Sequence, residues 1–451
     1  MKKKLSKKKG VLSMLLTLSM IIITVGCSSS STGLEIVNPE SVGLSTEKLA
    51  VITSTYQKLI DDKQLPGSVT LVARNGKIAY LSAQGYADIE NQVLMRPDTM
   101  FRLASVTKAI VNLAAMMEWE RGAFKLDDPI SKYIPEFKNS QVLIPNSDNT
   151  TYTLVPANSE ITIWNLFTHT SGLAYGGFDE GSPQLATIYA ASGVSNGMAP
   201  VNFDNAENVK RIATLPLKFH PGESWAYGHS AAVIARLVEV TSGKSIEQYI
   251  REKICLPLGM NDTYFHVPKE KVSRIARPYL VLGANQMIRM DDGVQIVPGF
   301  DPAYPYESNT KLESGDGGLV STVIDYYFFT QMMLNKGQLN GVRILQRETV
   351  ELMITNQLAN VDLSTGGFGV ETVYGPTFSG MGWGLGVAVL VDPSRAWTMA
   401  NAGLFGWAGV WGTSFFADPT ADLIMIQMEQ TLGLQPGQMA ILPLAFDAIK
   451  K

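Results

Sequence analysis

The sequence predicts a mixed fold of helices and strands, α/β in the broad sense and α+β in the strict one. One antiparallel β-sheet is flanked by helices, and a mainly helical subdomain is inserted. Three observations carry this prediction. Two β-rich runs joined by a tight turn lie near the N-terminus, and a series of short strands occupies the last third of the chain. Between them, helical patches alternate with loops rich in Pro, Gly and Asn. The strands from the two ends are therefore expected to pair in one sheet.

The N-terminus has the composition of an export signal. Its first nine residues contain six lysines and no acid, and the apolar run 11–25 is shorter than the roughly 20 residues needed to span a bilayer. Cys27 follows small residues and precedes a run of serines. Residues 1–26 are expected to be a lipoprotein signal peptide, Cys27 the lipidated residue and 27–39 a flexible linker; an uncleaved N-terminal anchor is the alternative. The expected location is extracytoplasmic, at the cell membrane of a bacterium.

The charge of the chain argues against nucleic-acid binding, and its cysteine content argues against a disulfide or a cysteine metal cluster. Residues 1–26 contain six basic residues and no acidic ones, so the rest of the chain has 31 Lys plus Arg against 41 Asp plus Glu, a net charge of -10. Nucleic acid is therefore not an expected partner. Cys255 is the only cysteine besides Cys27, which argues against an internal disulfide and a cysteine metal cluster. We interpret Cys255 as a core thiol.

A β-hairpin is the first predicted element. Val69–Arg74 and Lys77–Leu81 are β-rich runs joined by Asn75 and Gly76, the residue pair that a type I′ turn prefers. A buried helix follows, because apolar residues recur at helical spacing over 107–119 and a glycine stands where that helix would end.

The remainder of the chain divides into a helical part and a strand part. Helical patches such as Ala231–Thr241 extend from Leu126 to about Asn309 with little strand alternation. A second apolar helix is expected over Asp325–Leu334. Four strands are then predicted, at Trp383–Val391, Ala396–Ala402, Gly412–Ala417 and Leu423–Met428.

Ser105 and Lys108 are the candidate nucleophile and base. The spacing Ser-x-x-Lys puts a hydroxyl and an amine one helical turn apart, so that the amine can take the serine proton. The pattern also begins at Ser6, Ser45 and Ser308, where it falls in the signal, at a helix N-cap and in a polar loop. Ser105 instead opens an apolar helix, whose free N–H groups favour developing negative charge. A capping serine with a solvated lysine is the alternative.

A lysine needs burial to act as a base, because its reference pKa lies near 10.4. The apolar residues around Lys108 make that burial plausible. The four histidines lie in no recognisable acid–base motif, and the single Gly-x-Ser-x-Gly match, around Ser195, lacks the strand–turn–helix context of a nucleophile elbow.

The segment Phe101–Lys108 resembles the active-site segment of class C β-lactamases, D-amino-acid-releasing peptidases and related β-lactamase-like esterases. Further segments agree with this family in order and spacing: 66–68, 166–173, 221–227, 315–319 and 409–418. The resemblance covers residues 40–450. It implies a β-lactamase-like serine hydrolase domain at 40–451, with 40–122 and 312–451 as its α/β part, 123–311 as its mainly helical part, and the active site between the two.

The resemblance also assigns Tyr227. The family's second motif is Tyr-x-Asn, which corresponds here to Tyr227-Gly228-His229, and it implies that the phenolic oxygen lies near Ser105 and Lys108 and shares the transferred proton. The residues alone also allow a tyrosine that packs in the core. His229 replaces the asparagine that helps to grip β-lactams, which weakens the lactamase interpretation and leaves His229 as a substrate-binding candidate.

The third motif, Lys-Thr-Gly or His-x-Gly, corresponds to Trp407-Ala408-Gly409, which has neither a cation nor a hydroxyl. A Trp-x-Gly version resembles the esterase branch, whose substrates are neutral esters. An indole offers apolar surface and one N–H donor, so Trp407 and Gly409 are expected to bind substrate; core packing is the alternative for Trp407. The same correspondence implies an oxyanion hole formed by the backbone N–H groups of Ser105 and Val410.

Two further residues lie in matching segments. His169 belongs to a loop that is structural in the family, and Tyr175, just beyond it, is expected to line the pocket. We expect a serine hydrolase that works through an acyl-enzyme, most simply a carboxylesterase for short or medium acyl esters, with no metal or cofactor required. The alternatives are a β-lactamase or a peptidase for D-amino-acid peptides of the cell wall, and a non-catalytic lipoprotein that binds a ligand. The expected partners are a small-molecule ester or amide and, through the lipid, the membrane.

Overall fold

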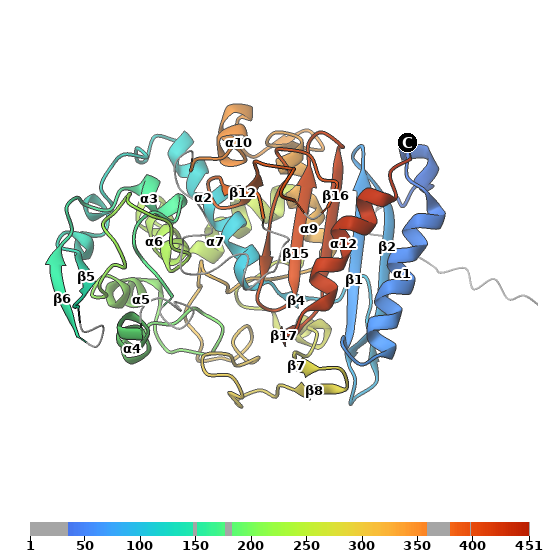
Figure 1. The fold of residues 1–451 in the computed structure, drawn as a ribbon, viewed down its shortest axis with the longest axis horizontal. Coiled ribbons are helices and arrows are strands. Elements are labelled where there is room, and N and C mark those ends of the chain that lie inside the picture. The colour runs from blue at the N-terminus through green and yellow to red at the C-terminus, as the bar shows by residue number, and fades with distance from the viewer. Residues whose placement is uncertain (1–34, 148–150, 176–182, 359–378, 397, 451) are drawn as a thin grey trace, which may run out of the picture. The chain divides into compact units, whose positions relative to one another are not determined.

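The computed structural model describes residues 35–147, 151–175, 183–358, 379–396 and 398–450. Residues 36–451 form one compact unit, and Figure 1 shows the arrangement of its described residues. The predicted signal peptide and Cys27 lie outside the described residues. Among those that are described, no helix combines the length and the apolar character that a membrane crossing requires.

An antiparallel sheet of eight strands forms the framework. Its order is β12-β13-β14-β15-β16-β1-β2-β3, so β16 (Leu423–Met428) pairs with β1 (Gly67–Arg74). This pairing joins the C-terminal meander to the N-terminal hairpin, as the sequence predicts. The other strands are β2 (Lys77–Asp88), β3 (Val93–Leu94), β12 (Met381–Trp383), β13 (Ala388–Leu390), β14 (Phe405–Gly409) and β15 (Thr413–Asp418).

Helices cover both faces of the sheet. Neighbouring side chains of a strand point to opposite faces. Ser414 of β15 lies within 3.5 Å of the Gln438 carbonyl in α12 (Pro436–Asp447), whereas the ring of Phe415 lies 4.9 Å from that of Tyr326 in α9 (Val323–Leu334). Helix α1 (Thr46–Asp61) packs beside α12 (Figure 1). Thus α1 and α12 lie on one face and α9 on the other.

The mainly helical part lies beyond one end of the sheet (Figure 1, teal to yellow-green). Its central helix α6 (Ser230–Ser242) packs against the buried helix α2 (Thr107–Glu120), which leads out of the short 3-10 turn η2 (Ala104–Val106). The remaining helices are α3 (Ile163–Phe167), α4 (Pro183–Ala191), α5 (Asn205–Ile212), α7 (Ile246–Ile250), α8 (Leu256–Leu258) and α10 (Arg347–Met353). Short helical turns are η1 (Pro39–Val42), η3 (Ile130–Lys132), η4 (Pro135–Phe137), η5 (Arg251–Cys255) and η6 (Lys269–Arg274).

The helical part also contains two β-hairpins, which the sequence does not predict. They are β5 (Gln141–Pro145) with β6 (Tyr152–Pro156), and β7 (Tyr279–Gly283) with β8 (Gln286–Arg289). Strand β17 (Thr431–Gly433) adds to β7 in parallel and so connects the end of the main sheet with this region. Two further pairs are β4 (Phe101–Arg102) with β9 (Val320–Ser321), and β10 (Gln338–Leu339) with β11 (Val342–Arg343).

The predicted strand at Ala396–Ala402 is wrong for the described residues of that range, because β14 begins only at Phe405. Asn401 forms a corner there: its backbone N–H and its side-chain amide both donate to the Asp418 carboxylate, at 3.0 and 2.9 Å. Gly403 follows with a φ of 88°, a conformation that breaks a strand. The predicted strand Trp383–Val391 is likewise divided into β12 and β13.

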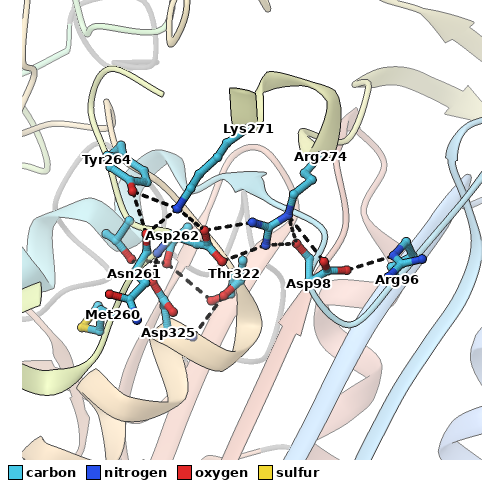
Figure 2. Close-up of polar contacts among 12 residues, drawn as sticks. Arg96, Asp98, Met260, Asn261, Asp262, Tyr264, Lys271, Arg274, Thr322 and Asp325 are labelled. Carbon is cyan, nitrogen blue, oxygen red and sulfur yellow. Dashed lines mark hydrogen bonds and ion pairs between the residues drawn. The ribbon is translucent and has the colours of Figure 1, made fainter. Parts of the chain in front are cut away.

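A network of charged side chains ties the loop after α8 to the α/β part (Figure 2). Asp262 accepts from Arg274 at 2.7 Å and from Lys271 at 2.8 Å, and Arg274 also reaches the Asp98 carbonyl at 2.6 Å. The backbone N–H of Asp262 donates to Asp325 in the first turn of α9, at 2.7 Å. The network therefore joins the loop after α8 to Asp98, which precedes β4, and to the first turn of α9, which follows β9.

Candidate active site

The chain turns sharply just before Ser105. Ala104 is buried and has a φ of 48°, in the left-handed region that a residue with a side chain rarely adopts. A glycine lies on either side of this turn. A Cβ on Gly409 would come within 2.2 Å of the Leu103 carbonyl, and one on Gly317 within 3.3 Å of the Ala104 Cα. Both glycines thus permit the close approach that places Ser105 at the start of the helical turn.

Hydrogen bonds from three elements hold this segment. The Leu103 carbonyl accepts from Thr413 Oγ1 at 2.7 Å, and the Leu103 N–H donates to the Leu319 carbonyl at 2.8 Å. On the far side of Ser105, the Tyr326 hydroxyl donates to the Val106 carbonyl at 2.8 Å. The nucleophile segment is therefore positioned by β15, by the strand pair of β4 and β9, and by α9.

Lys108 points at the serine from within the core. Its Nζ donates to Ser105 Oγ at 3.4 Å and to the backbone carbonyl of Asp316. Complete burial lowers the pKa of Lys108 to about 8, against an opposing effect of the Asp316 charge. The carbonyl acceptor holds the amine in place and, being uncharged, does not favour the ammonium form as a carboxylate would. A substantial fraction of Lys108 is therefore the neutral amine at mildly alkaline pH.

The Tyr227 ring lies close to the amine. Lys108 Nζ is 4.9 Å from the centre of the Tyr227 ring and 5.4 Å from that of Tyr175. The indole N–H of Trp407 donates to the Tyr227 hydroxyl at 2.8 Å. Trp407 is 1% exposed. Its one polar group is thus donated to Tyr227, and Trp407, like Ser105, Lys108 and Tyr227 themselves, is not among the described residues that line the cavity beside the site.

His169 is packed within the same aromatic group. Its ring centre lies 4.8 Å from that of Tyr227 and 5.1 Å from that of Trp383. Burial first, and then the charge of Lys108, lowers the pKa of His169 to about 3. The residue is therefore uncharged at physiological pH and supports the Tyr227 ring, which agrees with the scaffold role expected for its loop.

His229 is coupled to an acid whose role no sequence pattern predicts. Its Nδ1 lies 2.7 Å from Asp316 Oδ2, and the other carboxylate oxygen of Asp316 accepts from the Ala232 N–H at 3.1 Å. Although burial opposes its charge, the hydrogen bond from His229 and the nearby charge of Lys108 keep the pKa of Asp316 below its usual value. Asp316 therefore supports Lys108 through its carbonyl and His229 through its carboxylate.

The predicted oxyanion donors are the backbone N–H groups of Ser105 and of Val410, which follows Gly409. Ser105 is the second residue of the η2 turn, where backbone N–H groups lack partners within the helix. No hydrogen bond from the Val410 N–H is found within the described part of the chain. The carbonyls of both Gly409 and Val410 are bonded, to Gln438 at 2.9 Å and to Gln435 respectively, which orients the intervening peptide. Gly409 thus serves close packing against Leu103.

A cavity of about 640 Å³ adjoins these residues. Three site residues expected from the sequence, Tyr175, His229 and Val410, line it. The other described lining residues are mostly apolar: Tyr189, Ala190, Val194, Asn196, Leu280, Val297, Pro298, Gly299, Phe300, Leu432 and Gly433. Apart from His229, none of the described lining residues has an acidic or a basic side chain. The cavity is therefore suited to a neutral, largely apolar substrate.

The other candidates have structural roles. Ser45 Oγ accepts from the Lys48 N–H and caps α1, and Ser195 Oγ accepts from the Gly197 N–H within a loop. Burial raises the pKa of Cys255, so this thiol is unreactive. One group of described residues has the ligand types of a metal site, Glu247, His266 and Glu313, but His266 and Glu247 already bond each other at 3.0 Å.

Comparisons with known proteins agree with this geometry. Residues 52–446 match the protein family described as Beta-lactamase. Esterase EstB from Burkholderia gladioli is 33% identical over 406 residues, which are 87% of this chain and 93% of EstB. Protein Rv1367c from Mycobacterium tuberculosis is 33% identical over 84% of this chain and 88% of its own length. The solved structure of EstCE1, described as a hydrolase with promiscuous acyltransferase activity, has a TM-score of 0.74 at 27% identity and covers 90% of this chain and 99% of its own.

Proposed function

The chain belongs to the β-lactamase family, and from this premise we propose that it is a serine hydrolase with carboxylesterase activity on short or medium acyl esters. The observation that carries the proposal is the pair formed by Ser105 and Lys108. Their reacting atoms lie 3.4 Å apart, and the pKa of Lys108 is lowered to about 8. Esterase EstB, at 33% identity, supports the choice of esters.

The reaction begins with proton transfer. The neutral amine of Lys108 takes the proton of Ser105 Oγ while that oxygen attacks the ester carbonyl carbon. Negative charge then develops on the carbonyl oxygen, where the N–H groups of Ser105 and Val410 stabilise it. The tetrahedral intermediate collapses as the carbon–oxygen bond to the alcohol breaks, and the proton passes through Lys108 and Tyr227 to the leaving alcohol.

Hydrolysis of the acyl-enzyme reverses these steps with water. Tyr227 and Lys108 take a proton from the attacking water, the second tetrahedral intermediate releases the carboxylic acid, and Ser105 Oγ regains its proton. The proton transfers in both halves of the reaction use the side chains of Ser105, Lys108 and Tyr227. The hydrogen bond from Trp407 keeps the Tyr227 hydroxyl at the required position.

The uncharged cavity favours esters over the substrates of lactamases and cell-wall peptidases. Those substrates carry a carboxylate, and no lysine or arginine is found among the described residues that line the cavity. The indole N–H of Trp407 is already donated to Tyr227 and does not replace the missing cation. In contrast, burial of a neutral acyl chain against Val297, Phe300 and Leu432 lowers the free energy of the complex.

Incubation of the purified protein with 4-nitrophenyl butyrate, and separately with nitrocefin, tests the proposal. We expect butyrate turnover that Ser105→Ala abolishes, a butyryl adduct on Ser105 in intact-mass spectra, and little cleavage of nitrocefin. Faster turnover of nitrocefin than of butyrate would favour the lactamase alternative. If neither substrate is turned over and no adduct forms, the protein is not an esterase, and a ligand-binding lipoprotein becomes the better explanation.

We also propose that the protein is a lipoprotein held at the outer side of a bacterial cell membrane through Cys27. The lysine-rich start, the apolar run 11–25 and the serine linker support this proposal. Metabolic labelling with palmitate should mark the wild type in the membrane fraction and leave Cys27→Ser unlabelled. Equal labelling of the two proteins would contradict it.

A further inference from the structure

His229 has one ring nitrogen that the protein uses and one that it leaves open. Nδ1 lies 2.7 Å from Asp316 Oδ2. No hydrogen bond to Nε2 is found among the described residues, and Nε2 is also absent from the fully buried polar atoms without a partner. The side chain as a whole is only 6% exposed. A polar nitrogen at the rim of a buried ring is therefore still accessible.

The accessible nitrogen lies on the cavity side. His229 is a lining residue, and its ring packs between two others, with centre distances of 4.6 Å to Tyr175 and 6.2 Å to Tyr189. The two nitrogens of an imidazole lie on opposite edges, so an Nδ1 directed at Asp316 turns Nε2 away from it. The two tyrosine rings fix this orientation.

Asp316 determines what Nε2 offers. The Asp316 carboxylate is fully buried and accepts from the Ala232 N–H at 3.1 Å, so the carboxylate is anchored at the first turn of α6. An ionised carboxylate can only accept, so Nδ1–H of His229 donates to Asp316, and a ring with a single proton has that proton on Nδ1. Nε2 then bears a lone pair and acts as an acceptor.

We infer that the His229–Asp316 pair makes Nε2 a hydrogen-bond acceptor within the apolar cavity, and that it selects esters whose acyl chain carries a hydroxyl or N–H group. The inference deepens the proposed esterase function and rests on it. A plain alkyl chain would displace water from Nε2 without replacing the hydrogen bond, and a site built around a polar atom discriminates against substrates that leave it unpaired.

Three esters with the same leaving group test this inference: 4-nitrophenyl butyrate, 3-hydroxybutyrate and 3-methoxybutyrate. The hydroxyl can donate, whereas the methoxy oxygen can only accept. We expect kcat/KM of the wild type for the hydroxy ester to exceed that for the methoxy ester by roughly three- to tenfold, the size of one neutral hydrogen bond. The ratio of the two values cancels any general loss of active enzyme.

Three variants identify the atom responsible. His229→Phe keeps a ring between the two tyrosines and should bring the ratio to about one. Asp316→Asn should reverse the tautomer, because its amide donates to Nδ1 and leaves the proton on Nε2, and the preference for the hydroxyl over the methoxy group should then fall. His266→Phe is the matched control: His266 also bonds a carboxylate, that of Glu247, at 3.0 Å, but it is not among the described residues that line the cavity, so the ratio should stay at the wild-type value.

The outcomes separate the inference from the proposed function. Ser105-dependent hydrolysis of all three esters with a ratio that His229→Phe does not change would overturn the inference and leave the esterase proposal standing. A wild-type preference for the 4-nitrophenyl ester of succinate over all three would also overturn it, because it would identify His229 as a cation. If no ester is hydrolysed in a Ser105-dependent way, both fail.

Discussion

Lys108 meets the two requirements of a proton-transfer base, proximity to the nucleophile and a lowered pKa. Its Nζ contacts Ser105 Oγ, and the second acceptor of the amine is an uncharged carbonyl. A carboxylate in that position would favour the ammonium form and raise the pKa. The Asp316 carboxylate instead bonds His229. Asp316 thus holds Lys108 through its backbone carbonyl and His229 through its carboxylate, and the carboxylate does not bond the Lys108 amine directly.

The pH dependence of catalysis should follow this amine. Deprotonation activates Lys108, so kcat/KM for 4-nitrophenyl butyrate should rise as the pH increases through about 8 and fall below it. Lys108→Arg keeps the charge but cannot lose its proton, and should reduce kcat by roughly 10²-fold or more. Rates between pH 6 and 10, corrected for spontaneous ester hydrolysis, check both expectations. A profile that stays flat across pH 8 would argue against Lys108 as the base.

Trp407 acts through Tyr227. Trp407→Phe retains an aromatic ring next to Trp383 but removes the N–H that holds the Tyr227 hydroxyl. We expect kcat to fall by about tenfold with a smaller change in KM, because the lost hydrogen bond orients a proton-transfer group rather than the substrate. Steady-state kinetics with 4-nitrophenyl butyrate provide the measurement. A large rise in KM at unchanged kcat would instead indicate that the indole contacts the substrate.

At the level of elements, the site depends on how closely strand β14 approaches the turn before α2. Gly409 at the end of β14 and Gly317 before β9 both leave room for the backbone of Leu103 and Ala104. Ala104 itself has a left-handed backbone conformation, which costs of order 1–3 kcal/mol for a residue with a side chain. The surrounding hydrogen bonds from Thr413 and Tyr326 maintain it.

A methyl group at Gly409 should therefore displace the nucleophile. Gly409→Ala would place Cβ 2.2 Å from the Leu103 carbonyl, so we expect at least a tenfold loss of kcat and a lower free energy of unfolding. The matched control is Gly283→Ala in β7, where the nearest atom would be 3.7 Å away and neither quantity should change much. Urea unfolding and ester hydrolysis of both variants test this. Wild-type activity in Gly409→Ala would show that the turn does not need the close contact.

At the scale of the whole molecule, the loop that follows Val410, the proposed oxyanion donor, packs against a buried acid at the end of the sheet. The Glu429 side chain accepts from Gln427 at 3.0 Å and from Thr431 at 2.8 Å, and it lies against Gly412 and Gly437. Burial raises the pKa of Glu429 to about 8. The acid is therefore protonated in the folded protein at neutral pH.

This acid should make stability depend on pH. In the unfolded chain a glutamate ionises near pH 4.3. Between about pH 4.5 and 8, ionisation of this residue therefore lowers the free energy of the unfolded state but not that of the folded state. The contribution of Glu429 to stability is thus present at low pH and is lost as the pH rises through this range. Glu429→Gln should show a smaller fall in the urea midpoint between pH 5 and 8 than the wild type does. Identical falls in the two proteins would mean that Glu429 does not titrate in this way.

The charged network around Asp262 holds two parts of the chain together. It links the loop after α8 in the helical part to Asp98 and to the N-terminus of α9 (Figure 2). The helical part supplies Tyr227 and His229, whereas Ser105 lies at its junction with the sheet. Contacts between these two parts of the chain therefore bring the residues of the site together.

The sequence by itself determined the elements whose signals are local. The Asn75-Gly76 turn and the β-rich runs on either side of it predict the hairpin, the spacing of apolar residues predicts α2 and α9, and Leu423–Met428 coincides with β16. Ser105, Lys108 and Tyr227 were identifiable as well, the first two by their spacing and the third through its motif. The short hairpins β5–β6 and β7–β8 were not, because strands of four or five residues without clear alternation resemble loops.

Only the tertiary structure decided how these residues are coupled. Asp316 lies 87 positions from His229, and Trp407 lies 180 from Tyr227; each pair is joined by a hydrogen bond that no local pattern encodes. The cavity likewise combines Tyr175, Phe300 and Leu432 from distant segments. Burial of Lys108, which sets its pKa, depends on the packing of all these elements at once. The sequence thus specified the candidate reacting groups, and the fold determined their orientation and surroundings.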